Sequence, residues 1–111
     1  MKRGDVVIAA PGGPFGSKPR PYVVVQSDGF ATPLVVLIGF TTAEEPDPSL
    51  IRPRFLPSRS NGLQNVSDAM VDALIAVRRH KVKEVIGILS DEEMYEIEAA
   101  LVQLLGLAEP A

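Results

Sequence analysis

Runs of apolar residues, interrupted by proline and glycine, divide the chain into short strand-like segments followed by one helix. The run at 5–10, DVVIAA, and the runs at 22–27 and 34–41, YVVVQS and LVVLIGFT, are rich in valine and isoleucine. Because the last two runs are nearly all apolar, we predict central strands that are buried on both faces. The stretch at 10–21 carries four prolines and three glycines and predicts a loop.

The second half of the chain contains weaker strand signals and one strong helix signal. Residues 50–57, LIRPRFLP, predict an edge strand, because proline cannot donate a hydrogen bond to a neighbouring strand. Residues 67–77 show an alternating pattern and are predicted as one strand, although their composition also permits a helix. A helix is predicted after Ser90, which forms a capping box with Glu93, and it closes at Gly106. Its apolar stripe consists of Met94, Ile97, Leu101, Leu104 and Leu105.

The order of these elements, strands first and one helix last, predicts an α+β fold. We expect a single domain over residues 1–111, built as a small curved antiparallel β-barrel or half-barrel with a C-terminal helix packed on it. The apolar run near the N-terminus is too short for a signal peptide or a membrane span. A cytoplasmic protein without membrane contact is therefore expected.

Charge is distributed unevenly along the chain. Residues 90–111 hold six acids and no Lys or Arg, whereas residues 1–89 hold eleven basic residues and eight acids. The body is thus mildly basic, although the whole chain has a net charge of −3. This asymmetry is compatible with a body that binds phosphate groups, but an acidic helix face is also typical of solvated surface.

Several kinds of chemistry find no support in the sequence. The absence of cysteine excludes disulfides, thiolate zinc sites and thiol catalysis. His80 is the only histidine and lies in the basic segment RRHKVK, which indicates a surface residue rather than a catalytic base. The acids cluster on the terminal helix instead of converging from different elements, so we expect no metal and no cofactor.

Arg20 and two threonines stand at the ends of neighbouring strands. Arg20 begins the second strand, and Thr41 and Thr42 end the third. If these strands are adjacent and antiparallel, the guanidinium and the hydroxyls meet at one edge of the sheet. An arginine fork with a hydroxyl suits a phosphodiester. The spacing leaves a second interpretation open, in which Arg20 pairs with Asp28 or Glu44. Thr41 is then only a strand-forming residue.

Several motifs follow one another along the chain, namely RGDVV, KPRPYVVVQSD, TPLVVLIGFTT, LIRPRFLPSRSNGL, SDAMVD and a closing helix that ends in LGL. Their order and spacing resemble those of the MazF/PemK toxins, the endoribonuclease components of toxin–antitoxin pairs. The resemblance extends from Lys2 to Leu107. The family fold, a small curved β-barrel with a helix at its end, agrees with the fold that the residue pattern predicts.

The resemblance implies an endoribonuclease that cleaves single-stranded RNA without a metal or another cofactor. In this family the ribose 2′-hydroxyl attacks the adjacent phosphorus and leaves a cyclic phosphate and a free 5′-hydroxyl. By resemblance, Arg20 and Thr41 are the catalytic residues. The residues that the resemblance places along the RNA are Lys18, Thr42, Arg52, Arg54, Arg59 and Ser67.

The resemblance also implies two protein partners. Family members are homodimers, and their RNA groove runs across the dimer interface. A cognate antitoxin is expected to combine a DNA-binding N-terminus with an acidic, disordered tail that covers the groove. Cleavage of mRNA by the free toxin would inhibit translation and growth.

Two departures from the family pattern leave alternatives open. The loop at 10–21 lacks the carboxylate that many relatives carry before the arginine, and Ala73 and Ala76 replace polar residues near the proposed groove. These changes allow a weak or inactive member, or one with altered sequence preference. A CcdB-like protein that poisons DNA gyrase shares the fold, but its terminal helix usually ends in a tryptophan-bearing segment, and this chain has no tryptophan. A catalytically silent binding domain is the third alternative.

Overall fold

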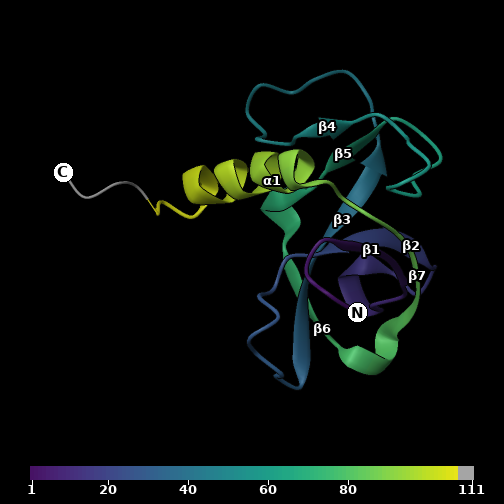
Figure 1. The fold of residues 1–111 in the computed structure, drawn as a ribbon. Coiled ribbons are helices and arrows are strands. Elements are labelled where there is room, and N and C mark those ends of the chain that lie inside the picture. Colours follow the sequence, from purple (N-terminus) through teal and green to yellow (C-terminus); the bar gives the residue numbers. More distant parts are fainter. Residues whose placement is uncertain (108–111) are drawn as a thin grey trace.

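The chain folds into a curved antiparallel sheet with a helix lying against it (Figure 1). The computed structural model describes residues 1–107. The strands are β1 (Asp5–Ala9), β2 (Arg20–Val24), β3 (Leu34–Thr42), β4 (Arg54–Phe55), β5 (Ser67–Ala69), β6 (Ile75–Arg78) and β7 (Val82–Ile88). The 3₁₀ turns η1 (Gly13–Phe15), η2 (Val71–Ala73) and η3 (Arg79–Lys81) and the helix α1 (Asp91–Leu104) complete the described elements.

β3 is the central strand of the sheet. One edge of β3 pairs with β2, and its other edge pairs with β5 at one end and with β6 at the other. β1 lies beyond β2, and β7 and β4 form the two ends of the sheet. The predicted α+β fold with a curved half-barrel is confirmed, since the sheet does not close into a full barrel within residues 1–107.

The predicted strand over residues 67–77 is wrong as a single element. The segment forms β5 and β6, which are separated by η2. Strict alternation would place Val71 on the same face as Ile75, but Val71 belongs to the apolar cluster beneath α1 and Ile75 to the cluster on the other side of the sheet. The turn at η2 moves the chain from one cluster to the other, and this requirement is not visible in a local pattern.

Apolar side chains fill both faces of the central strands. The cluster beneath α1 contains Val6, Val23 and Ile38. Their chain neighbours Val7, Val24 and Leu37 belong to the cluster on the opposite face. Successive side chains of a strand point to opposite faces, so both faces of β1, β2 and β3 are covered. The continuous apolar runs in the sequence have this physical cause, and the predicted central strands are confirmed. The predicted edge strand at 50–57 contains β4, which pairs only with β5.

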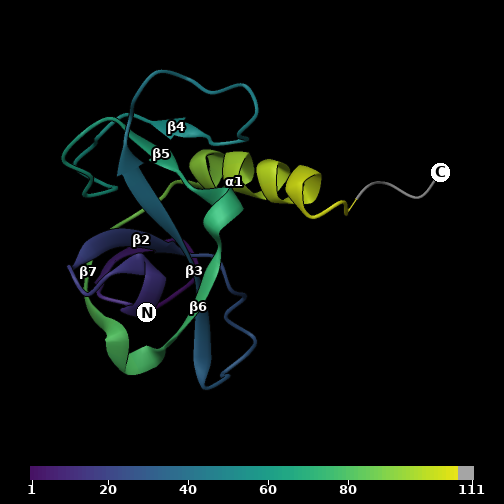
Figure 2. The ribbon, with the colours of Figure 1, turned by 180° about the vertical axis from the view of Figure 1, so that it is seen from behind.

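Helix α1 begins and ends as the sequence predicts. The Ser90 side chain accepts a hydrogen bond from the backbone N–H of Glu93, and the Glu93 carboxylate accepts one from the backbone N–H of Ser90. Gly106 follows the helix with a φ of 68°, a backbone conformation that favours glycine. In both ribbon views α1 runs between the β4–β5 part of the sheet and the curled strands β1, β2 and β7 (Figures 1 and 2).

The apolar stripe of α1 is only half covered by the sheet. Met94 and Ile97 are buried, whereas Leu104 is 41% exposed and Leu105 is 54% exposed. Figure 2 shows why, because the C-terminal end of the helix projects beyond the strands. The last turn of the apolar stripe therefore stays exposed in the single chain. Within residues 1–107 no helix is long and apolar enough to cross a lipid bilayer.

A close backbone contact joins β7 to the loop before β5. A Cβ atom added at Gly87 would lie 2.4 Å from the carbonyl carbon of Asn61 and 2.6 Å from the carbonyl oxygen of Ser60. Real side chains do not approach backbone atoms so closely. Only glycine therefore allows this loop to lie against the strand.

We expect Gly87→Ala to lower the free energy of unfolding by about 2 kcal/mol or more, because the added methyl group must push the loop away from β7. Gly29→Ala is the matched control, since a Cβ at Gly29 meets only the Ser27 hydroxyl at 3.5 Å. Urea unfolding of both variants measures the difference. Equal stabilities of the two variants would show that the contact at Gly87 is not tight in solution.

Candidate active site

The pairing of β2 with β3 places Arg20 and Thr41 side by side. Tyr22 lies opposite Gly39 in the antiparallel register. This is the last residue pair of the ladder, and the same register continued by two residues along each strand leads to Arg20 and Thr41. Residues opposite each other in antiparallel strands point to the same face, so the guanidinium and the hydroxyl share one side of the sheet. The predicted adjacency of the two strands is confirmed.

Both residues line one cavity of about 350 Å³. Its walls come from β1, β2, the end of β3, the segment before β5, and β7. The lining residues are Ile8, Arg20, Pro21, Phe40, Thr41, Thr42, Glu44, Gly62, Leu63, Gln64, Asn65, Ser67 and Ile86. We call this space the Arg20 cavity. Most of its polar lining consists of hydroxyl and amide groups, and Arg20 is the one cationic residue that lines it among residues 1–107.

Arg20 has no ionic partner among the described residues. The ion pairs in this part of the chain are Arg3–Glu98, Arg52–Asp72 and Arg54–Asp68. Asp28 instead accepts a hydrogen bond from the backbone N–H of Arg3 at 2.7 Å. Glu44 lines the Arg20 cavity but forms no ion pair with Arg20 within residues 1–107. The pairing that the sequence left open is therefore absent from this region, and the guanidinium is available to an anion.

Tyr22 and Gly39 lie opposite each other, two residues along their strands from Arg20 and Thr41. A Cβ at Gly39 would lie 2.9 Å from Cε2 of Tyr22, so the glycine leaves room for the aromatic ring to cross β3. Burial raises the pKa of the Tyr22 phenol, and the nearby positive charge of Arg20 partly offsets this effect. The buried ring thus packs against Gly39 of β3, two residues along β2 from Arg20.

The other predicted RNA-binding residues fall into three groups. Thr42 and Ser67 line the Arg20 cavity. Arg52 and Arg54 line an adjoining cavity of about 530 Å³, which also contains Thr41 and Thr42. Lys18 and Arg59 are exposed on loops outside both cavities.

The two arginines of the adjoining cavity are held by carboxylates. Arg52 donates two hydrogen bonds to Asp72, at 2.7 and 2.9 Å, and Arg54 donates two to Asp68, at 2.8 and 3.2 Å. The hydrogen bonds that Arg52 donates to Asp72 lower the pKa of Asp72 and raise the pKa of Arg52. Any phosphate that reaches these arginines must share them with the carboxylates.

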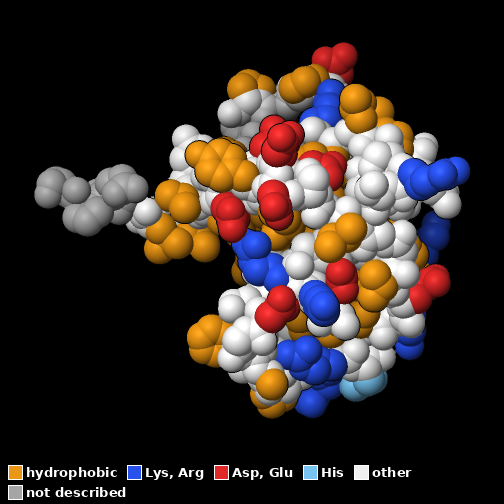
Figure 3. Space-filling model, viewed as in Figure 1, with side chains coloured by type: hydrophobic (Ala, Val, Ile, Leu, Met, Phe, Trp, Pro, Cys, Tyr) orange, Lys and Arg blue, Asp and Glu red, His pale blue; other side chains and the backbone are white. Residues whose placement is uncertain are grey.

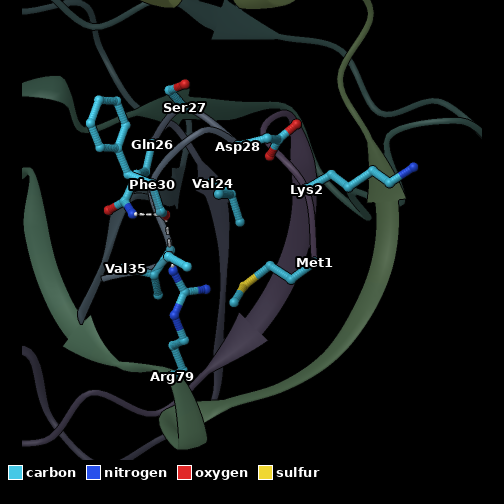
Figure 4. A pocket seen from close by; sticks show the side chains of 10 residues that line it. Met1, Lys2, Val24, Gln26, Ser27, Asp28, Phe30, Val35 and Arg79 are labelled. Carbon is cyan, nitrogen blue, oxygen red and sulfur yellow. Dashed lines mark hydrogen bonds between the residues drawn. The ribbon is translucent and has the colours of Figure 1, made fainter. Parts of the chain in front are cut away.

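A further cavity, of about 250 Å³, lies near the N-terminus and has a different character (Figure 4). Arg79 points into it, but its guanidinium donates to the backbone carbonyl oxygens of Thr32 and Phe30. The Gln26 amide also donates to the Phe30 carbonyl. These groups hold the loop between β2 and β3, and none of the predicted site residues lies here.

Sequence reasoning missed the amide side chains of Gln64 and Asn65, which line the Arg20 cavity. Their signal was available, since they directly follow the NGL motif. Neither Ala73 nor Ala76 lines this cavity in the single chain, and Ala76 lies opposite Val36 beside a separate hollow. His80 is exposed in η3. No group of three potential metal-ligating His, Cys, Asp or Glu side chains occurs within residues 1–107.

Comparison with known proteins identifies the class to which this fold and cavity belong. A family model described as "PemK-like, MazF-like toxin of type II toxin-antitoxin system" matches residues 2–105. The chain belongs to this family of toxins. A "Probable endoribonuclease MazF" of Mycolicibacterium smegmatis is 38% identical over 109 residues, which cover 97% of this chain and 99% of the relative.

Solved structures show the same fold. A mycobacterial endoribonuclease in complex with its cognate antitoxin has a TM-score of 0.80 and 22% identity, with 99% of each chain covered. MazF of a MazE–MazF complex from Deinococcus radiodurans has a TM-score of 0.74 and 18% identity, with 97% of this chain and 98% of that chain covered. The Mycobacterium tuberculosis toxin MazF-mt6 has a TM-score of 0.77 and 17% identity, with 95% and 99% covered.

These findings confirm the toxin family predicted from the sequence motifs. The endoribonuclease activity predicted from the sequence agrees with the name of the mycobacterial relative. The gyrase-poison alternative is not favoured, since the family model and the relative both belong to the MazF group.

The Arg52–Asp72 ion pair should make stability depend on pH in the acid range. A lowered folded-state pKa means that the pair contributes fully above the ordinary value of 3.8 and loses its contribution as the pH falls below it. We expect Asp72→Asn to lower the free energy of unfolding by about 1 kcal/mol near neutral pH. The difference from wild type should shrink toward about pH 3. Urea unfolding of wild type and Asp72→Asn, near neutral pH and at about pH 3, measures this difference in the free energy of unfolding.

Glu84→Gln is a suitable control for this experiment, because Glu84 is exposed on β7 and forms no ion pair within the described residues. If Asp72→Asn lowers the free energy of unfolding by the same amount at both pH values, the stabilisation by this ion pair is not electrostatic.

Proposed function

We propose that this toxin cleaves single-stranded RNA within the Arg20 cavity, without a metal ion. In the reaction the ribose 2′-oxygen forms a bond to the adjacent phosphorus, and the bond from phosphorus to the 5′-oxygen breaks. The 2′-hydroxyl loses its proton and the departing 5′-oxygen gains one. The products are a 2′,3′-cyclic phosphate and a free 5′-hydroxyl. This chemistry requires the protein mainly to position the nucleotide and to stabilise negative charge.

The observation that carries the proposal is the position of Arg20 next to Thr41 in one cavity, without an ionic partner among the described residues. A free guanidinium offers two parallel N–H groups to the phosphate oxygens, on which charge accumulates in the transition state. The Thr41 hydroxyl can donate a further hydrogen bond to the same group. The Arg20 side chain is exposed, so a phosphate can reach the guanidinium.

The remaining predicted residues extend the RNA path from this centre. Thr42 shares the cavity with Arg20, and Arg52 and Arg54 line the cavity beside it. Together with the exposed Lys18 and Arg59, these side chains would contact phosphates irrespective of base sequence. Ser67 also lines the cavity and is buried. An RNA substrate is consistent with the cytoplasmic location expected from the sequence.

The assembly proposed is a homodimer that binds an antitoxin. The side chains after residue 101 form an exposed apolar surface, which we call the helix-end patch, consisting of Val102, Leu104, Leu105 and Leu107. Figure 3 shows hydrophobic side chains gathered at this end of α1. A second copy of the chain would remove this surface from water. The acidic, disordered tail of the antitoxin would cover the Arg20 cavity and compete with RNA for its positive charge.

Arg20→Ala should lower the single-turnover rate of RNA cleavage by roughly 100-fold or more, as the loss of a transition-state donor typically does. RNA affinity should change little by comparison. Arg20→Lys should restore little activity, because an ammonium group lacks the planar fork. Rates measured with a labelled single-stranded RNA at saturating enzyme test both variants.

Arg78→Ala provides the matched control, since Arg78 is exposed on β6 and does not line the Arg20 cavity. EDTA should leave the wild-type rate unchanged, and DNA should remain intact because it lacks the 2′-hydroxyl nucleophile. Growth inhibition by wild-type protein with all RNA intact would disprove the proposed activity.

For the assembly, light scattering at micromolar concentration should show a dimer. Leu104→Asp combined with Leu105→Asp should shift the protein toward monomer, because two carboxylates would be desolvated at the interface. Leu56→Asp is the control, since Leu56 is 73% exposed on a loop before β5 and lies outside the helix-end patch. A monomeric wild type would refute the proposed dimer. A double variant that stays dimeric would show that the interface lies outside the helix-end patch.

A further inference from the structure

The segment Gly62–Asn65 forms a wall of the Arg20 cavity, which the strand ends that carry Arg20 and Thr41 also line. Gln64 and Asn65 are exposed on this wall, and their side-chain amides form no hydrogen bonds to other described residues. Each amide offers an N–H₂ donor and a carbonyl acceptor. The cavity therefore combines two charged groups, on Arg20 and Glu44, with neutral amides that offer free donors and acceptors.

The start of this wall is fixed by Asn61, whose side chain has no exposed surface. Its carbonyl oxygen accepts hydrogen bonds from the backbone N–H groups of Ser58 and Leu63, both at 3.0 Å. Its amide nitrogen donates to the Leu56 carbonyl at 3.0 Å and to the Glu93 carboxylate at 3.2 Å. All hydrogen-bonding capacity of the Asn61 amide is used within the protein.

The hydrogen bond to Glu93 ties the wall to the helix. Glu93 is the capping-box residue of α1, so one carboxylate holds both the helix start and Asn61. On the other side, the N–H of Ile88 donates to the Ser60 carbonyl at 2.8 Å, and Gly87 allows the close approach described above. The loop is therefore anchored to both α1 and β7.

The end of the wall is fixed by Ser67. The Ser67 hydroxyl is nearly inaccessible and donates to the backbone carbonyl of Asn65 at 2.8 Å. Anchors at both ends hold the backbone of the wall, while the side chains of Gln64 and Asn65 remain unengaged. Because the backbone of the wall is already fixed, less conformational freedom is lost when a ligand binds to these side chains.

We propose that Gln64 and Asn65 read the base of a nucleotide beside the scissile phosphate, and that Asn61 and Ser67 are the positioning residues of this wall. Phosphate contacts from Arg20 and its neighbours carry no sequence information. Recognition of single-stranded RNA relies on hydrogen bonds to the edges of unstacked bases, and a side-chain amide can satisfy a donor and an acceptor on such an edge. The inference rests on the proposed RNA cleavage and assigns the sequence preference to residues that take no part in the chemistry.

The test is the cleavage of an RNA library with randomised sequence, followed by sequencing of the cut sites. Wild-type protein should show a preference at one or more positions next to the cut. Gln64→Ala or Asn65→Ala should reduce discrimination at one of these positions by roughly tenfold, as the loss of a base contact typically does. The cleavage rate on the preferred sequence should fall far less than for Arg20→Ala. Gln103→Ala, which removes an exposed amide on α1, should leave the profile unchanged.

The outcomes separate this inference from the proposed function. Wild-type protein that cleaves no RNA would refute the proposed function itself. Wild-type protein that cleaves without preference, or variants that keep the wild-type cut-site profile, would refute base reading while leaving the cleavage chemistry intact.

The cut-site profiles of two further variants test Ser67 and Asn61 as positioning residues. Ser67→Ala removes the hydroxyl that holds the Asn65 carbonyl and should relax the same position of the profile as Asn65→Ala. Asn61→Ala should do so too, measured at a temperature where circular dichroism shows the variant to be folded. A folded Ser67→Ala variant with the wild-type profile would overturn the role of Ser67 as an anchor.

Discussion

The antiparallel pairing of β2 with β3 is the constraint on which the candidate site depends. Its register carries Arg20 from a proline-rich loop to the side of Thr41, and no other contact in residues 1–107 neutralises the guanidinium. The pairing is held by apolar clusters on both faces of the sheet and by the Tyr22 ring across Gly39. A slip of one residue in this register would turn Thr41 toward the opposite face of the sheet and separate the two functional groups.

The helix contributes to the site although it supplies none of its lining residues. Glu93 caps the helix and holds Asn61, and the loop that follows Asn61 forms the cavity wall. The Glu93 carboxylate thus links the start of the helix to the loop that lines the cavity. The same helix leaves its final turn exposed, so its first half serves the monomer fold and its last residues are available for assembly.

Much of this arrangement could be predicted from the sequence. The apolar runs predicted the central strands, and the proline and glycine residues predicted the loop that delivers Arg20. The division of 67–77 into two strands could not be predicted, because it depends on which apolar cluster receives Val71 and which receives Ile75. The roles of Gln64 and Asn65 were missed for a similar reason. Local patterns do not show which loop folds back over the end of a strand that is distant in the sequence.

The central claim is that Arg20 and Thr41 act together on one phosphate. A double-mutant cycle with Arg20→Ala and Thr41→Val tests it most directly, with single-turnover RNA cleavage as the readout. Groups that stabilise the same transition state are not independent, so the double variant should lose much less activity than the product of the two single losses. Single losses that simply multiply in the double variant would show that Arg20 and Thr41 act separately, which would contradict a shared action on one phosphate.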